Sequence, residues 1–399
     1  MRPRAGEWRA RLLLAAFSSA LALGFAEFAA RILLRPVAAR PAEGTPISEF
    51  SPTLGWRTRP GGSQRIVRED FEVTVAINSL GLRGPEIPYE PAPLRRRLAI
   101  MGDSFAHGYY AEEPQTLRGR LAEPLSPCRV DVLNAGGPGY STDQEWIFYD
   151  EEIRKYRPSE VVVLFYYNDL EFNLDRLGTA NRPKPVFVEK DGALQLIPPA
   201  NDLRPLGPRE GPKAPRRAPR FHGSALWAFA AARLQPSRPD WSRVLSTWGL
   251  APAISDVPPA EFVPFAPLGA AETARVEEMW KRTGALFARF RDDVRGQGAG
   301  FSVFYVPARF EANDRAWAFL GRRYSDRRVW SRDAVRKRLA SVLAALDIPM
   351  VDVTAAFEAA EKAGPPAYLP VDGHWNARGN EIAFESLLPQ MRRAFACAS

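Results

Sequence analysis

Five short apolar runs, separated by longer stretches of helical periodicity, constrain the fold of this 399-residue chain most strongly. The runs occupy residues 98–102, 130–134, 161–166, 301–306 and 349–353. Helical periodicity marks residues 271–296, 330–346, 354–363 and 376–396. Short buried strands that alternate with helices are typical of βαβ units and a parallel sheet. The sequence therefore predicts a three-layer α/β/α domain over residues 95–399, with a five-stranded parallel sheet in the flavodoxin-like order.

A long insertion interrupts this domain. The gap between the third and fourth predicted strands is too long for a simple crossover, so we assign residues 171–265 to an insertion. Its predicted parts are a hairpin over residues 185–197 that turns at Asp191-Gly192, a basic proline-rich stretch at 203–220 and a short apolar helix near 224–234. We expect the insertion to cap the active site and to determine substrate choice.

Two further segments precede the domain. Residues 36–50 contain three prolines among small and polar residues, a composition typical of a linker. Residues 51–94 include an alternating stretch at 71–77, which predicts a half-buried strand followed by turn glycines. We therefore expect residues 51–94 to form a small β-containing collar that packs on the main domain.

Residues 1–35 predict export of the rest of the chain. Four arginines, at positions 2, 4, 9 and 11, precede an apolar run from Leu12 to Ala26. Positive charges before such a run predict a cytoplasmic N-terminus, with the rest of the chain on the periplasmic side. A helix continued to Leu34 would extend about 34 Å, against about 30 Å for a bilayer core. We expect a single-pass transmembrane anchor in the cytoplasmic membrane; a cleaved signal peptide, which would secrete the chain, is the alternative.

Composition argues against several classes of function. The formal net charge is +8, but the arginines are scattered and no nucleic-acid-binding module accompanies them, so we expect no nucleic-acid partner. Cys128 and Cys397 belong to no C-x-x-C motif or Cys/His cluster, which argues against a structural zinc site. They either pair in an oxidising compartment or are two unrelated thiols. No Lys-Ser/Thr follows the glycines at 136–139, so we expect no nucleotide cofactor.

Polar residues follow the predicted strands at the edge where a parallel sheet binds its ligands. The first strand runs into Gly102-Asp103-Ser104, which places a hydroxyl and a free backbone N–H at a helix N-terminus. The second strand ends in a turn at residues 134–139, whose glycines permit close approach of backbone N–H groups to a ligand. The third strand is followed by Asn168-Asp169, and Asp372-Gly373-His374 comes after the fifth.

These four blocks, in this order and strand context, resemble those of the SGNH or GDSL-like hydrolases. The resemblance covers roughly residues 97–170 and 300–390. It implies that Ser104 attacks an acyl carbonyl and that His374 removes the serine proton and later protonates the leaving group. It also implies that Asp372 orients and stabilises the imidazolium.

The same resemblance implies an oxyanion hole. Its donors would be the backbone N–H groups of Ser104 and Gly139 and the side-chain amide of Asn168, with Gly136 as the second choice of glycine. It implies no metal and no organic cofactor. In many members the acid lies three residues before the histidine, whereas Asp372 lies two residues before His374. That shorter spacing, followed by Trp-Asn, is similar to a subgroup of O-acetyl-transferring proteins of exopolysaccharide export.

Several of these residues have simpler interpretations. Ser104 is also a typical helix N-cap, and His107 is a rival base on spacing alone. His222 lies in the insertion and is expected at the surface. Asp103 and Asp169 are expected to brace their loops rather than to transfer protons. The arginines at 95–97 are expected to be a solvated strand entry, with contact to lipid headgroups as the alternative.

We therefore predict a serine ester hydrolase that removes ester-linked acyl groups, most of all acetyl, from an envelope or exopolysaccharide saccharide or a small acyl ester. The alternatives are an O-acyltransferase, a lipid or thioester hydrolase, and a non-catalytic carbohydrate-binding scaffold. The sequence leaves the oligomeric state open.

Overall fold

The computed structural model describes residues 5–33, 42–68, 70–179, 182–199, 268, 273–323, 330–370 and 372–397. The chain forms two compact units. One contains helix α1 (Ala5–Leu33), and the other contains nearly all of the remaining described residues. The basic stretch predicted at 203–220 and the apolar helix predicted near 224–234 lie outside the described residues.

Helix α1 carries most of the large apolar side chains that the structure leaves exposed, among them Leu13, Phe17 and Phe25. Near its end, the Arg31 guanidinium donates to the Glu27 carboxylate four residues earlier, at 2.8 Å. Within the described part of the chain, no helix is both long enough and apolar enough to cross a bilayer. The transmembrane helix predicted within residues 1–35 is therefore not supported by the structure.

The second unit is built on a five-stranded sheet. Its strands are β6 (Arg96–Gly102), β7 (Val130–Gly136), β8 (Glu160–Phe165), β11 (Gly300–Tyr305) and β12 (Met350–Asp352). All are paired in parallel, in the order β12-β11-β8-β6-β7. This is the predicted flavodoxin-like order, and each of the five predicted strands is confirmed to within two residues.

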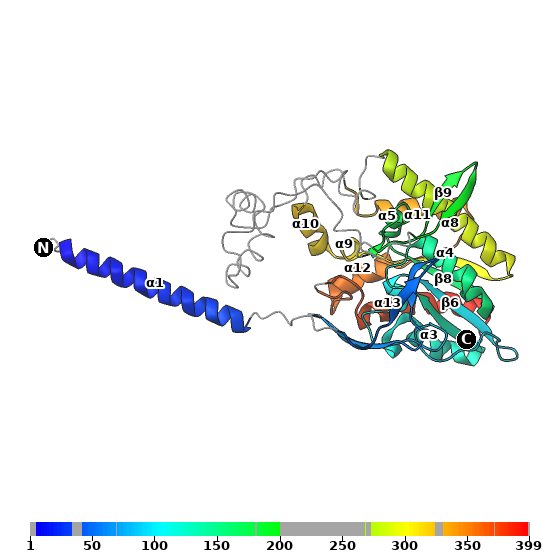
Figure 1. Ribbon diagram of the computed structural model, residues 1–399, viewed down its shortest axis with the longest axis horizontal. Helices are drawn as coiled ribbons and strands as arrows, with labels where there is room; N and C mark the ends of the chain where they lie inside the picture. Colours follow the sequence, from blue (N-terminus) through cyan, green and yellow to red (C-terminus); the bar gives the residue numbers. More distant parts are fainter. Residues whose placement is uncertain are drawn as a thin grey trace. The chain divides into compact units, whose positions relative to one another are not determined.

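Helices cover both faces of the sheet because successive strand residues point to opposite sides. Leu164 and Phe304 belong to the core formed with α3 (Leu117–Leu125), α12 (Thr354–Ala363) and α13 (Ala377–Ala394). Phe165, one residue after Leu164, and Phe301, three residues before Phe304, point to the opposite face of the sheet. Their rings contact Phe287 and Phe290 of α8 (Ala274–Gly296). Helix α8 in turn packs on α4 (Thr142–Glu151) and α11 (Ala334–Ala345). Figure 1 shows α3 and α13 on one side of β6 and β8, and α4 and α8 on the other.

The described part of the insertion contains the predicted hairpin. Strands β9 (Val186–Lys190) and β10 (Ala193–Ile197) pair antiparallel. Asp191 and Gly192 both have positive φ, 53° and 75°, as a two-residue turn of this hand requires. The hairpin is confirmed.

The collar is larger than predicted. It contains a three-stranded antiparallel sheet of β1 (Glu43–Thr45), β4 (Ser63–Val67) and β5 (Glu72–Ala76). Between β1 and β4 in the sequence, β2 (Ser48–Ser51) and β3 (Gly55–Thr58) form a separate hairpin. Strand β1 and most of β2 therefore fall within 36–50, the range predicted as a linker. Of the three prolines that suggested a linker, Pro46 lies between these two strands, where it interrupts no ladder.

The arginine run at the start of β6 is not the solvated strand entry that the sequence suggested. Arg97 is 1% exposed, and its guanidinium donates to the carbonyls of Pro88, Tyr89 and Tyr156. The Arg95 guanidinium pairs with Asp131 on β7 at 2.6 Å. The run therefore links the collar, β7 and the segment before β8. Its role is structural.

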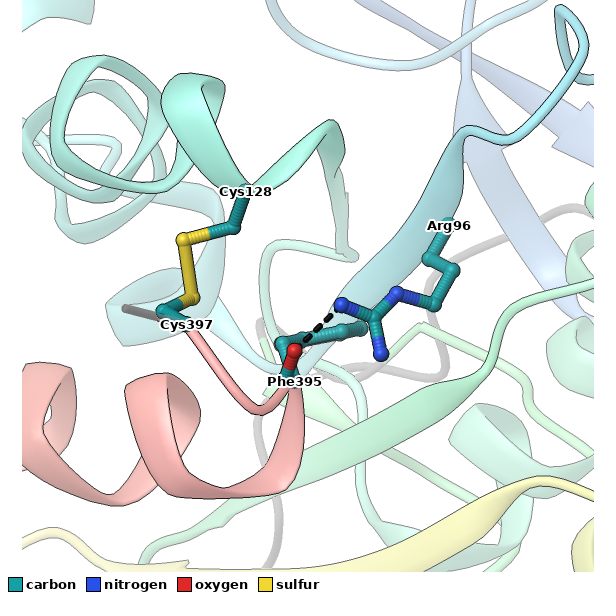
Figure 2. Close-up of a disulfide and its surroundings, with 4 residues drawn as sticks. All are labelled: Arg96, Cys128, Phe395 and Cys397. Carbon is teal, nitrogen blue, oxygen red and sulfur yellow. Dashed lines mark hydrogen bonds between the residues drawn. A yellow bond between two sulfur atoms is a disulfide. The ribbon is translucent and has the colours of Figure 1, made fainter.

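Cys128 and Cys397 form a disulfide, with their Cα atoms 5.3 Å apart. Figure 2 shows it joining the turn after α3 to the residues after α13. Beside it, the Arg96 guanidinium donates to the Phe395 carbonyl and lies over the Phe395 ring at 5.0 Å. Of the two alternatives for the cysteines, the structure has the pair.

Replacing Cys128 and Cys397 by serine is expected to lower the free energy of unfolding by about 2 to 5 kcal/mol, because the bond constrains a long loop of the unfolded chain. Chemical denaturation of the variant and the oxidised wild type measures this difference. Alkylation of the unreduced, denatured protein followed by mass spectrometry is the control. Two alkylated cysteines in freshly purified, unreduced protein would contradict the pairing.

Candidate active site

Ser104 stands at the first turn after the central strand β6. Gly102 ends the strand at φ 142°, and a Cβ there would come within 3.0 Å of Ala106 and Leu164. Asp103 follows as the N-cap of α2 (Ser104–His107), and its carboxylate accepts from the Phe105 backbone N–H at 2.9 Å. The Asp103 cap thus leaves the Ser104 side chain free to point away from the helix.

The glycine turn after β7 lies against this strand end. Gly102 pairs with Gly136 in the sheet, and the Gly137 N–H donates to the Gly102 carbonyl at 2.9 Å. The Gly136 N–H is engaged by the Asn134 side chain at 3.2 Å, which argues against Gly136 as an oxyanion donor. Gly139 has φ 78°, a conformation that favours glycine, and among the described residues no acceptor contacts its N–H.

The collar braces the same turn. The Trp56 indole N–H donates to the Pro138 carbonyl at 2.9 Å, and the Tyr140 hydroxyl donates to the Trp56 carbonyl at 2.8 Å. These two bonds bracket Gly139. The turn is therefore held by the collar as well as by the sheet.

Asp372 and His374 lie on a tight hairpin between α12 and α13. The hairpin is closed by an antiparallel bridge between Tyr368 and Trp375 and by a 2.7 Å bond from the Leu369 N–H to the His374 carbonyl. Gly373, at φ 85°, reverses the chain between the two functional residues. This reversal allows an acid only two residues before the histidine to fold back onto its ring.

The structure brings Ser104, His374 and Asp372 together in one line. Ser104 Oγ lies 2.8 Å from His374 Nε2, and His374 Nδ1 hydrogen-bonds to the Asp372 carboxylate. Partial burial raises the pKa of Asp372, but the hydrogen bond and the charge of His374 outweigh burial, and the net pKa is lowered. Asp372 therefore stays ionised at neutral pH. This arrangement can take a proton from a serine hydroxyl and stabilise the resulting imidazolium.

The residues after His374 anchor it to the core. Trp375 is 2% exposed, stacks on Phe357 at 5.1 Å and meets the edge of Phe105 at 4.9 Å. The Asn376 side chain caps α13 by accepting from two backbone N–H groups, at 2.9 and 3.1 Å. A Cβ at Gly379 would lie 2.4 Å from the Ala367 carbonyl, so this glycine lets α13 pack against the hairpin. Each residue of the Trp-Asn block thus has a positioning role.

Asn168 follows β8, the other neighbour of β6. Leu164 of β8 is paired with Gly102, so Asn168 leaves the sheet at the same edge as Ser104. Its neighbour Asp169 is buried and accepts from the Thr142 hydroxyl at 3.2 Å. Burial and the charge of the nearby buried Glu145 both raise the pKa of Asp169 well above its usual value. A protonated, buried side chain suits the bracing role predicted for Asp169.

The other two histidines do not compete with His374. His107 is fully buried, and within the described residues neither of its ring nitrogens has a partner. Burial and the Arg83 guanidinium hold the pKa of His107 well below its usual value. His222 lies outside the described residues. Across the described ranges, no group of three His, Cys, Asp or Glu side chains is arranged to hold a metal ion.

Three residues near the site were missed by sequence reasoning: Phe105, Tyr110 and Asp70. The rings of Phe105 and Tyr110 stack on the His374 imidazole at 4.6 and 4.1 Å. The Asp70 carboxylate of the collar accepts from the Asp372 backbone N–H at 3.0 Å. Phe105 and Tyr110 could have been found from the sequence, because they are aromatic residues that closely follow Ser104. No sequence pattern in the collar marks Asp70.

A family comparison bears on these findings. Residues 269–398 match the family model described as the SGNH hydrolase-like domain of the acetyltransferase AlgX. This part of the chain is therefore similar to an SGNH hydrolase-like domain. The resemblance predicted from the four motif blocks is confirmed, and the matched residues include Asp372 and His374. Ser104, Gly139 and Asn168 precede the matched part of the chain. A search of curated proteins found no match.

Two solved structures align with this chain at low similarity. A catalytic mutant of Axe2, an acetylxylan esterase from Geobacillus stearothermophilus, aligns at 12% identity and a TM-score of 0.37, over 77% of this chain and 98% of its own. The lipase/acylhydrolase from Enterococcus faecalis aligns at 12% identity and a TM-score of 0.37, over 75% and 96%. At these values the alignments carry no inference about fold or activity.

The titration of Asp103 tests the described environment of the turn that carries Ser104. Burial raises the pKa of Asp103 to about 6, although the hydrogen bond from Phe105 lowers it. Its contribution to stability is therefore complete below the unfolded pKa of about 4 and is lost as the pH rises through about 6. Asp103→Asn keeps a good N-cap and removes this titration. The variant should gain stability relative to wild type between pH 4 and pH 6, measured by denaturation at a series of pH values, and a constant difference would contradict this account.

Proposed function

We propose that this chain is a serine-dependent enzyme that hydrolyses or transfers the acetyl ester groups of a saccharide. The observation that carries the proposal is the line of contacts from Ser104 Oγ through the His374 ring to Asp372. The family model supports an acetyl-modifying reaction, because it describes an acetyltransferase domain of SGNH type. The saccharide is inferred from the resemblance of the Asp-x-His-Trp-Asn block to exopolysaccharide-modifying proteins.

The geometry supports a two-step mechanism. His374 Nε2 accepts the proton as Ser104 Oγ attacks the acetyl carbonyl carbon, and the Asp372 carboxylate stabilises the imidazolium. The backbone N–H groups of Ser104 and Gly139 and the Asn168 amide would donate to the oxyanion of the tetrahedral intermediate. Collapse breaks the bond between the carbonyl carbon and the sugar oxygen, His374 protonates that leaving oxygen to give the sugar hydroxyl, and the acetyl group remains on Ser104. Water then completes hydrolysis, or the hydroxyl of a second saccharide completes transfer.

The serine mechanism is tested by hydrolysis of a short-chain aryl acetate with the full-length protein. Ser104→Ala and His374→Ala are each expected to lower kcat by at least about a thousandfold, because the nucleophile and its base act as one unit. His107→Gln, at the buried histidine whose ring nitrogens make no hydrogen bond within the described residues, is the matched control for loss of an imidazole. Equal activity in wild type and Ser104→Ala would contradict the proposal.

Asn168→Ala tests the oxyanion hole separately. Loss of one donor to the developing charge is expected to lower kcat by about a hundredfold or more with little change in KM, because the bond strengthens in the transition state. A change confined to KM would instead assign Asn168 to substrate binding.

Hydrolysis and transfer differ in the fate of the acetyl group. Incubation of the enzyme with an acetyl-ester donor and an unacetylated oligosaccharide separates them, because transfer adds acetyl to the oligosaccharide and hydrolysis releases acetate. Mass spectrometry of the oligosaccharide detects transfer, and an acetate assay detects hydrolysis.

A long-chain acyl thioester hydrolysed faster than any acetyl ester would favour the lipid or thioester alternative. Saccharide binding without turnover would favour the non-catalytic scaffold.

The proposal places the enzyme outside the cytoplasm, with the N-terminal segment holding it at the membrane. Two observations support this location. Arginines precede the apolar run of α1, whose large side chains are exposed, and the disulfide suits an oxidising compartment. Fractionation of cells followed by N-terminal sequencing separates the cases: an intact N-terminus in the membrane fraction indicates an anchor, and a shortened one in the soluble fraction indicates a cleaved signal.

A further inference from the structure

The collar reaches the hairpin that carries Asp372 and His374. Its contact lies between β4 and β5, the strands that end at Val67 and begin at Glu72. Asp70 in this turn accepts from the Asp372 backbone N–H at 3.0 Å. A segment some three hundred residues earlier in the chain thus binds the backbone of the acid that orients the histidine.

Aromatic side chains form a second route from this turn to the histidine. Phe71, next to Asp70, meets the Tyr110 ring edge-on at 4.9 Å and the Tyr109 ring at 6.4 Å. The Tyr110 ring then stacks on the His374 imidazole at 4.1 Å with 25° between the planes. Because Phe105 stacks on the imidazole as well, at 4.6 Å and 28°, the ring of His374 is held by two aromatic neighbours.

Tyr110 also acts on Asp372. Its hydroxyl interacts with the Asp372 carboxylate and contributes to the lowered pKa of that group. Burial, and then the negative charge of Asp372, raise the pKa of Tyr110, so the hydroxyl is protonated at neutral pH. One side chain thus packs on the base and helps to keep the acid ionised.

We propose that Asp70, Phe71 and Tyr110 are positioning residues that hold the Asp372–His374 hairpin in its catalytic geometry, so that the collar is an integral part of the active site. The inference rests on the proposed serine mechanism for its kinetic consequences. The positioning itself is a matter of geometry and has its own readout. The hydrogen bonds between Trp56 and the residues on either side of Gly139 give the collar a second contact with the same site.

The first test compares Asp70→Ala with Asp70→Asn. The alanine leaves the Asp372 N–H without its acceptor, and kcat for aryl acetate hydrolysis should fall about tenfold with KM nearly unchanged. Asparagine retains an acceptor oxygen and should restore most of the rate. Glu72→Ala is the matched control, because this carboxylate is two residues away and pairs with Arg65 on the collar surface. Equal rates for the three variants would overturn the proposal.

The second test uses Tyr110→Phe, which keeps the ring on His374 and removes only the hydroxyl. We expect a fall in kcat of about three- to tenfold. Tyr89→Phe is its control, because it removes a tyrosine hydroxyl that donates to the Glu152 carboxylate at 2.5 Å and not to the Asp372–His374 hairpin. A fall in kcat as large in Tyr89→Phe as in Tyr110→Phe would show a general effect on stability and would contradict the positioning role.

A spectroscopic readout separates this inference from the proposed function. The protein has only three histidines, so ¹⁵N-histidine NMR can assign the His374 Nδ1–H that is shared with Asp372. The strongly shifted proton of this bond should weaken or exchange faster in Asp70→Ala and Tyr110→Phe but not in the two controls. If wild type shows this signal and no hydrolysis, the proposed function fails while the positioning survives. If the signal is unchanged in all variants, the positioning fails whatever the activity.

Discussion

The hydrogen bond between Ser104 and His374 joins residues 270 positions apart, and most of the structure described above serves to form it. The serine is fixed by the central strand and by a glycine that no larger residue can replace. The histidine is fixed by a hairpin whose Trp375 is buried between sheet and helices. Because both supports belong to one core, the pair is formed by folding and not by substrate.

The carboxyl groups at this site differ in burial, and burial decides which of them are ionised. Asp372 is partly exposed, and its contacts with His374 and Tyr110 keep it charged. Asp169, which accepts from the Thr142 hydroxyl, is fully buried, and burial raises its pKa well above the usual range. An acid that stabilises an imidazolium must be charged, whereas carboxyls that brace a loop in the interior are less costly when neutral. The two environments match the two roles.

The sequence predicted the sheet, its strand order, the hairpin of the insertion and the motif blocks that meet at the site. The strands, the hairpin and the blocks depend on local signals, namely apolar runs, turn glycines and polar residues at strand ends, whereas the strand order follows the doubly wound arrangement common to such sheets. It did not predict the burial of Arg97 or the contact of Asp70 with Asp372, because both depend on which distant segments meet. The linker boundary was misplaced for a related reason: Pro46 reads as linker by composition, but it lies between two strands of the collar.

The central claim is that Ser104 is a nucleophile activated by His374. Covalent labelling with an organophosphonate, followed by peptide mapping, measures this directly and needs no knowledge of the natural ester. The account predicts a single adduct on Ser104 in the folded protein, absent in Ser104→Ala and formed far more slowly in His374→Ala. A folded protein that takes no label at Ser104, or takes it equally fast without His374, would contradict the account.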